Sequence, residues 1–288
     1  MSNRVVFGDN LEFVRTLGDG TFRMAYLDPP FNTGRRRRHA TLTTTRADGG
    51  DRTGFGGRRY ATVVGEERSY EDAFDDYLAF LQPRLSEVWR VLDEQGTLYL
   101  HLDYREVHHV KVMLDAMVGR RCFLNEVIWA YDYGARSRRR WPAKHDNILV
   151  YVKDPDRYWF DSEGVDREPY MAPGLVTAEK VARGKLPTDV WWHTFVPPTG
   201  REKTGYPTQK PEAILRRMIL ASTREGDAVL DCFAGSGTTG AVARALSRSY
   251  VLVDDNPEAI AVMRRRLGPD ADYGRADDLV DETGRLVD

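Results

Sequence analysis

Apolar positions recur along the chain in two spacings that alternate with each other. Short apolar runs typical of buried strands occur at 4–9, 22–28, 97–103, 123–131, 147–153, 227–233 and 249–255. Apolar residues spaced three to four positions apart predict helices over 10–17, 71–92, 105–119, 210–222 and 257–267, with Asn10 as the cap of the first. Strands alternating with helices predict an α/β fold with a doubly wound, mostly parallel sheet of about seven strands.

Two segments interrupt this alternation. Residues 32–69 are poor in apolar side chains and rich in Gly, Thr and Arg, and residues 154–208 hold many prolines without a clean periodicity. Long irregular insertions in α/β domains often serve binding. We therefore interpret 1–288 as a single domain in which 32–69 forms a loop and 132–208 an irregular segment, both available for substrate recognition.

The composition excludes several classes of protein. With 41% hydrophobic residues the chain is too apolar to be disordered, and the two distant cysteines, Cys122 and Cys232, make neither a disulfide scaffold nor a zinc finger. The sequence shows no apolar run long enough for a membrane span and no secretory leader. We expect a cytoplasmic protein of the bacterial type without a metal site.

The charges are nearly balanced overall but unevenly placed. Residues 35–68 hold nine arginines against four acids, and residues 134–144 hold Arg136, Arg138, Arg139, Arg140 and Lys144 with no acid. Two concentrated positive segments on an otherwise acidic chain favour contact with a polyanion, and nucleic acid is the expected partner.

A glycine-rich loop predicts a nucleotide site near the end of the chain. Gly235-Ser236-Gly237-Thr238-Thr239-Gly240 follows a predicted strand and opens a helix, and Asp254 ends the next strand. Glycines permit a tight turn and close backbone approach, and the acid can bind a ribose hydroxyl. Because few residues follow Gly240, earlier strands must complete the sheet, which predicts a permuted strand order.

The spacing leaves two kinds of nucleotide open. A dinucleotide places its pyrophosphate at the helix N-terminus, as in a NAD-dependent dehydrogenase. Asp231, just before the glycines, would repel a pyrophosphate but suits a ligand with an ammonium or sulfonium group, such as S-adenosylmethionine. This carboxylate favours the second ligand.

A second motif ends the predicted strand at 22–28. Asp28-Pro29-Pro30-Phe31 combines a carboxylate, backbone carbonyls and an aromatic ring at the edge where α/β sheets bind ligands. Such an acceptor-rich slot beneath a stacking ring suits the exocyclic amine of a flat base. A rigid turn with Phe31 in the core is the alternative.

Together these motifs resemble the β-class amino-DNA methyltransferases, in which Asp-Pro-Pro-Tyr/Phe precedes Phe-x-Gly-x-Gly. GDNLEFVRTL, LDPPFNTG, TGYPTQKPEAIL and LDCFAGSGTTG are similar to successive blocks of the family in its order. The blocks are shared with adenine-N6 methyltransferases of restriction-modification systems and with the longer type III modification subunits. The resemblance implies a permuted Rossmann-like, S-adenosylmethionine-dependent methyltransferase sheet.

The resemblance also assigns roles to individual residues. Asp28, Pro29, Pro30 and Phe31 would hold a flipped target base. The cofactor would lie against residues of the glycine loop, the first strand and the Thr-Gln-Lys-Pro segment: Asp9, Asn10, Thr208, Lys210, Asp231, Phe233, Ala234, Gly235, Gly237, Thr238 and Asp254. Lys210 would pair with the cofactor carboxylate and Asp254 would bind the ribose.

The implied reaction is methyl transfer to an exocyclic amine in double-stranded DNA after base flipping. Asp at the first motif position is the usual family choice for adenine N6, and cytosine N4 is the alternative. Arg35, Arg36, Arg37, Arg38, Arg136, Arg138, Arg139 and Arg140 would contact the DNA. A homodimer, a cognate restriction endonuclease and association with the nucleoid are further expectations, and the target sequence is not encoded in a readable form.

Overall fold

The computed structural model describes residues 2–32, 35–46, 52–53, 59–72, 74, 76–132, 134, 136–197 and 200–278. The chain divides into two units, one formed by Met1–Pro29 with Leu78–Asp288 and the other by Pro30–Tyr77. This division differs from the single domain that the sequence predicted. Its physical reason is that the strands between residues 30 and 77 pair with one another and not with the large sheet.

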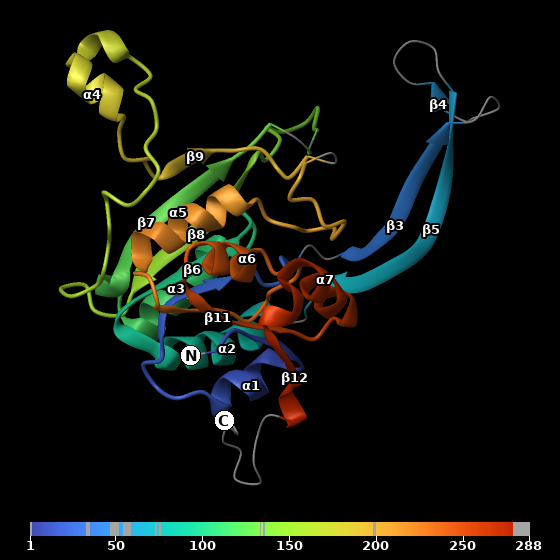
Figure 1. Cartoon of the computed structure of the whole chain (residues 1–288), viewed down its shortest axis with the longest axis horizontal. Coiled ribbons are helices and arrows are strands. Elements are labelled where there is room, and N and C mark those ends of the chain that lie inside the picture. The colour runs from blue at the N-terminus through green and yellow to red at the C-terminus, as the bar shows by residue number, and fades with distance from the viewer. Residues whose placement is uncertain are drawn as a thin grey trace. The chain divides into compact units, whose positions relative to one another are not determined.

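The first unit is built on a nine-stranded sheet with the order β12-β1-β11-β10-β2-β6-β8-β7-β9 (Figure 1). Six neighbouring pairs are parallel, and β8 is antiparallel to both β6 and β7. The strands span Arg4–Phe7 (β1), Phe22–Leu27 (β2), Leu92–Leu102 (β6), Phe123–Ala130 (β7), His145–Val152 (β8), Val190–Trp192 (β9), Ala228–Asp231 (β10), Ser249–Asp254 (β11) and Asp272–Arg275 (β12). The mostly parallel α/β fold is confirmed.

The permuted order is also confirmed. Strand β10, which leads into the glycine loop near the end of the chain, lies between β11 and β2 from the N-terminal part. The two strands beyond the expected seven are β9 and β12, both at the edges of the sheet. Neither shows a clear strand pattern in the sequence, because β9 has three residues and β12 is the polar tetrapeptide DYGR.

Helices cover both faces of this sheet. On one face lie α5 (Glu212–Ser222), α6 (Thr238–Ala245) and α7 (Pro257–Leu267), and on the other lie α1 (Asn10–Thr16), α2 (Tyr77–Val91) and α3 (Val107–Val118) (Figure 1). Strand residues alternate between them. Met24 and Tyr26 belong to the core under α5–α7, whereas Ala25 and Leu27 are buried on the opposite face.

Some helix caps and boundaries differ from the predicted ones. Asp9, rather than Asn10, caps α1, since its carboxylate accepts a hydrogen bond from the Glu12 backbone at 3.0 Å. Helix α2 begins at Tyr77 instead of 71, because Glu71 and Asp72 belong to a strand, and it keeps Pro83 inside. Pro211 occupies the N-cap of α5. Among the described helices, none combines the length and apolarity needed to cross a membrane.

The second unit is a three-stranded antiparallel sheet of order β3-β5-β4, formed by Arg35–Arg46 (β3), Arg52–Thr53 (β4) and Arg59–Asp72 (β5). The loop predicted over 32–69 is therefore wrong as secondary structure. Its many Thr and β-branched residues favour extended backbone, and pairing with β5 satisfies the hydrogen bonds of β3. Within 132–208, predicted to be irregular apart from the strand at 147–153, the structure contains α4 (Ala178–Arg183) and β9 in addition to β8.

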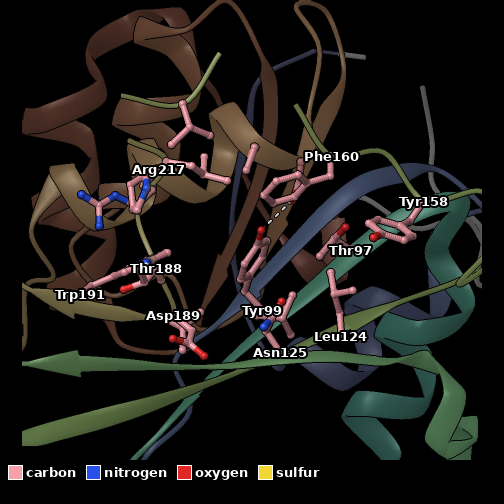
Figure 2. A pocket seen from close by; sticks show the side chains of 17 residues that line it. Thr97, Tyr99, Leu124, Asn125, Tyr158, Phe160, Thr188, Asp189, Trp191 and Arg217 are labelled. Atoms are coloured by element: carbon pink, nitrogen blue, oxygen red, sulfur yellow. Dashed lines mark hydrogen bonds between the residues drawn. The ribbon is translucent and has the colours of Figure 1, made fainter. Parts of the chain in front are cut away.

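A cavity of about 300 Å³ lies between the start of β6, the strands β7 and β8, the end of α5 and the segment around residues 158–189 (Figure 2). Its lining is mostly apolar and aromatic. Tyr99 donates or accepts a 2.7 Å hydrogen bond with Ser222 there. Thr97 is 2% exposed, and its hydroxyl has no hydrogen-bond partner among the described residues.

Thr97→Val should raise the free energy of unfolding by about 1 kcal/mol, because it removes a buried unsatisfied hydroxyl at almost constant volume. Denaturant unfolding measures the change. Thr223→Val is the matched control and should destabilise, since the Thr223 hydroxyl donates to Ile219 and accepts from Arg248. A loss of stability in Thr97→Val would mean that its hydroxyl has a bonding role.

Candidate active site

The carboxyl edge of the parallel strands gathers acidic side chains on one face. Asp28 follows β2, Asp231 ends β10 and Asp254 ends β11. Each lies two residues after a core residue of the α5–α7 face, so the period-two alternation of strands points all three toward that face. The structure thus brings together three carboxylates that lie far apart in the sequence.

The glycine loop turns tightly over this edge. Gly235 and Gly237 adopt left-handed φ values of +49° and +70°, and a Cβ on Gly237 would lie 2.7 Å from Met263 Cγ. The Gly235 amide donates to Asp254 at 2.7 Å, and the Asn256 amide donates to the other oxygen at 2.9 Å. Burial nonetheless raises the pKa of Asp254 to about 6.

Asp231 is the most deeply buried of the three carboxylates, at 2% exposure. It accepts hydrogen bonds from the Phe233 amide at 3.0 Å and from the Thr239 hydroxyl at 2.5 Å. Burial raises its pKa to about 7 despite these bonds, and the negative charges of Asp28 and Asp254 act in the same direction. A cationic ligand group would relieve this concentration of negative charge, and a pyrophosphate would add to it.

Asp28 forms an ion pair with the ammonium of Lys210 through its Oδ2 atom. Its Oδ1 atom is buried and has no hydrogen-bond partner among the described residues. An ionised carboxylate oxygen in this state keeps its lone pairs for a donor. The sequence predicted Lys210 for the cofactor carboxylate, so its pairing with Asp28 is a new contact.

A buried polar chain lies beside Asp28. His101 of β6 is fully buried, with Nδ1 2.8 Å from the Tyr26 hydroxyl and Nε2 3.2 Å from Asp146 Oδ2. The Tyr131 hydroxyl donates to Asp146 Oδ1 at 3.0 Å. His101 Nδ1 lies 3.9 Å from Asp28 Oδ1, which connects the chain to the predicted catalytic motif.

The start of α1 is fixed to the segment that leads into the glycine loop, and the cofactor role of Asp9 and Asn10 stays a prediction. Asn10 donates to the Cys232 carbonyl at 2.7 Å. Arg84 of α2 donates to Asn10 Oδ1 at 2.7 Å and to Asp9 Oδ2 at 3.0 Å. Phe233 lies near Phe80, at 6.3 Å between ring centroids, and the Ala234 amide donates to the carbonyl of Val253.

The Thr-Gln-Lys-Pro segment lies beside the same loop, but its residues differ in placement. Thr238 donates to the Lys210 carbonyl at 3.2 Å, which joins α6 to the start of α5. Thr208 is exposed, whereas Gln209 is buried and holds its own turn through bonds to Thr204 and Glu202. The role of Thr208 at the cofactor therefore stays a prediction.

The basic residues of the two predicted clusters belong to different units. Arg136, Arg138, Arg139 and Arg140 are exposed on the connection between β7 and β8, where the Ser137 hydroxyl accepts from the backbones of Arg139 and Arg140. Trp141 beside them is 95% exposed. Pro30, Phe31 and Arg35–Arg38 belong to the second unit, in which Arg35 and Arg36 are register partners of Asp72 and Glu71. Their roles stay predictions.

Sequence reasoning missed the importance of Tyr26, His101, Asp146 and Arg84. A signal was present for Tyr26 and His101, because each lies on a predicted strand in alternation with core residues, whereas Asp146 directly precedes the strand predicted at 147–153. The signal for Arg84 was absent, since its contact with Asp9 and Asn10 joins residues about 75 positions apart.

Comparison with known proteins identifies the class. The family profile for N6/N4-type DNA methylases matches residues 22–265, so the chain belongs to this DNA methylase family. This confirms the family that the motifs predicted and sets aside the dehydrogenase interpretation of the glycine loop.

Individual relatives cover nearly the whole chain. The type II methyltransferase M.HpaI of Haemophilus parainfluenzae is 29% identical over 97% of this chain and 78% of its own length. The DNA adenine methyltransferase YhdJ of Escherichia coli is also 29% identical, over 93% and 84%.

Solved structures share the fold. M1.HpyAVI in complex with SAM, S-adenosylmethionine, superposes with a TM-score of 0.58 at 19% identity, covering 92% of this chain and 98% of its own. The cytosine-N4-specific PvuII DNA methyltransferase gives a TM-score of 0.61 at 16% identity, covering 92% and 86%.

Asp231→Asn should flatten the pH dependence of stability. In the folded protein the pKa of Asp231 is about 7 against an ordinary 3.8, so the folded state binds more protons in this interval and stability falls as pH rises through it. Because the variant has no carboxylate at this position, its stability should not fall in this way. The difference in free energy of unfolding is on the order of a few kcal/mol. Thermal unfolding of both proteins across the interval measures it, and equal slopes would contradict the burial effect.

Proposed function

We propose that this DNA methylase transfers the methyl group of S-adenosylmethionine to N6 of adenine in double-stranded DNA. The observation that carries the proposal is Asp28, a carboxylate with a buried, unpartnered oxygen among the described residues, placed beside the glycine loop at the carboxyl edge of the sheet. An acceptor at this point suits the hydrogens of an exocyclic amine.

The residues present fit the cofactor. Asp254 keeps free lone pairs for ribose hydroxyls after accepting two backbone amides. Asp231 adds negative charge near the place for an ammonium or sulfonium group, and Asn10 with Asp9 borders the same loop. When bound, S-adenosylmethionine supplies an electrophilic methyl group.

The protein's own part in the reaction is to activate and hold the amine. The amine lone pair is delocalised into the base, so the free amine is a poor nucleophile. Asp28 and the Pro29 carbonyl accept its hydrogens and stabilise the positive charge that develops on the nitrogen. Phe31, by its place in the motif, stacks on the flipped base and offsets part of the extrusion cost.

Two observations favour adenine over cytosine. The first motif residue is Asp, the usual choice for adenine in the resembling family, and a full-length relative, YhdJ, is a DNA adenine methyltransferase. The PvuII enzyme, which shares the fold, is cytosine-N4-specific, so cytosine N4 is the second candidate.

On the DNA side, the exposed arginines between β7 and β8 supply phosphate contacts at the edge that bears Asp146 and Tyr131. A homodimer, a cognate restriction endonuclease and nucleoid association in a bacterial cytoplasm belong to the proposal as consequences of the family resemblance.

Asp28→Ala should lower methylation by roughly 10² to 10³-fold, because the amine loses its charged acceptor, while cofactor binding persists. Labelled cofactor, DNA lacking methylation and digestion to nucleosides give the rate and the product. Asp132→Ala, an exposed carboxylate, is the control and should keep its rate. N4-methylcytosine as the product would overturn the base assignment, and full activity of Asp28→Ala would overturn the mechanism.

Replacing Arg138, Arg139 and Arg140 together by Gln should weaken DNA binding and reduce the slope of log affinity against log salt by up to roughly 0.9 per lost phosphate contact. Fluorescence anisotropy at several salt concentrations measures the slope. Arg157→Gln, whose guanidinium pairs with Glu94 and Asp154, should leave it unchanged. An unaltered slope in the triple variant would remove this loop from the DNA interface.

A further inference from the structure

The fully buried His101 stands level with Asp28 on the neighbouring strand. Strands β2 and β6 are parallel with Leu27 opposite Leu100, so the next residues along, Asp28 and His101, occupy equivalent positions on the same face. The gap between His101 Nδ1 and Asp28 Oδ1 is 3.9 Å. The imidazole therefore lies close to the oxygen that Lys210 does not bind.

Burying a histidine costs free energy unless its ring nitrogens form hydrogen bonds. An apolar side chain would fill the same core space without polar groups to satisfy. The surrounding elements satisfy it closely. Tyr26 of β2 bonds Nδ1, Asp146 of β8 bonds Nε2, and the ring edge of Trp129 of β7 packs at 5.5 Å between centroids.

These contacts select one tautomer of the ring. Burial would raise the pKa of Asp146, but the hydrogen bonds with His101 and Tyr131 and the positive charge of Lys210 lower it below its ordinary value. Asp146 is therefore ionised at neutral pH and accepts only, so the proton must lie on Nε2 of His101. In the neutral ring, Nδ1 then has a lone pair, which accepts the hydroxyl hydrogen of Tyr26.

The tautomer of His101 decides whether a lone pair or an N–H group on Nδ1 lies near Asp28 Oδ1. A lone pair on Nδ1 donates nothing to Asp28, so this carboxylate keeps its accepting capacity for a substrate amine. In the opposite tautomer, the N–H on Nδ1 would donate to the Tyr26 hydroxyl 2.8 Å away, and its positive end would lie near Asp28 Oδ1 and weaken this oxygen as an acceptor.

We propose that His101, held in the Nε2–H tautomer by Asp146, is a positioning residue that keeps Asp28 a full hydrogen-bond acceptor for the target amine. The inference rests on the proposed role of Asp28 but is indifferent to whether the base is adenine or cytosine. Tyr26 and Tyr131 complete the arrangement, Tyr26 by occupying Nδ1 and Tyr131 by orienting Asp146.

Asp146→Asn tests the proposal with almost no change of shape. An asparagine amide that donates to Nε2 forces the proton onto Nδ1, toward Asp28. The single-turnover methylation rate should fall by roughly 10² to 10⁴-fold, the range seen when a buried acid that fixes a histidine tautomer becomes an amide. Affinities for cofactor and DNA should stay within about threefold, since no proposed contact to either is removed.

His101→Leu separates the tautomer effect from a structural one. With no ring present, no donor faces Asp28, so the double variant Asp146→Asn/His101→Leu should be faster than Asp146→Asn alone. A purely structural role predicts the reverse, because the double variant removes more native contacts. Asp115→Asn is the matched control: Asp115 also accepts from a tyrosine, Tyr151, and its replacement should leave the rate unchanged.

Nitrogen-15 NMR of the histidine rings gives a readout that does not need activity. The wild-type protein should show His101 protonated on Nε2 alone, and Asp146→Asn should show it protonated on Nδ1. A wild-type ring protonated on Nδ1 at neutral pH would overturn the inference, as would Asp146→Asn methylating within about threefold of wild type. Absence of methylation by the wild-type protein would instead refute the proposed function, and the NMR result would still decide the tautomer.

Discussion

The site depends on holding several carboxylates close together at one edge of a parallel sheet. Asp28, Asp231 and Asp254 share a face because each ends its strand in phase with the core, and their mutual repulsion adds to the cost of burial. A different group stabilises each of the three carboxylates. Backbone amides of the glycine loop bind Asp254, Thr239 binds Asp231, and Lys210 neutralises Asp28.

This arrangement explains why the parts of the chain are ordered as they are. A permuted sheet places the strand before the glycine loop directly beside the strand that carries Asp28. The cofactor region and the base region therefore become neighbours although the two motifs stand about 200 residues apart. Lys210, whose carbonyl accepts from Thr238 and whose ammonium binds Asp28, joins the two regions physically.

Much of this could be predicted from local sequence. The spacing of apolar residues predicted the strands and helices of the large sheet, and the late glycine loop predicted its permutation. The short edge strands β9 and β12 were missed because β9 is too short, and β12 too polar, to show an alternation of apolar and polar residues. The sheet of residues 35–72 was missed because Arg and Thr repeats look like a loop without their cross-strand partners. Lys210 was predicted to bind the cofactor carboxylate, and its ion pair with Asp28 was not foreseen, since an ion pair between distant residues leaves no trace in either segment.

The proposed function is that the carboxylates at this edge promote methyl transfer from S-adenosylmethionine to the amine of adenine in DNA. The most direct measurement is to express the chain in a bacterium that lacks DNA methylases and to map modified bases across its genome by single-molecule sequencing. We expect N6-methyladenine at one recurring short sequence. Unmodified DNA in cells that contain the folded protein, or N4-methylcytosine at the modified positions, would contradict it.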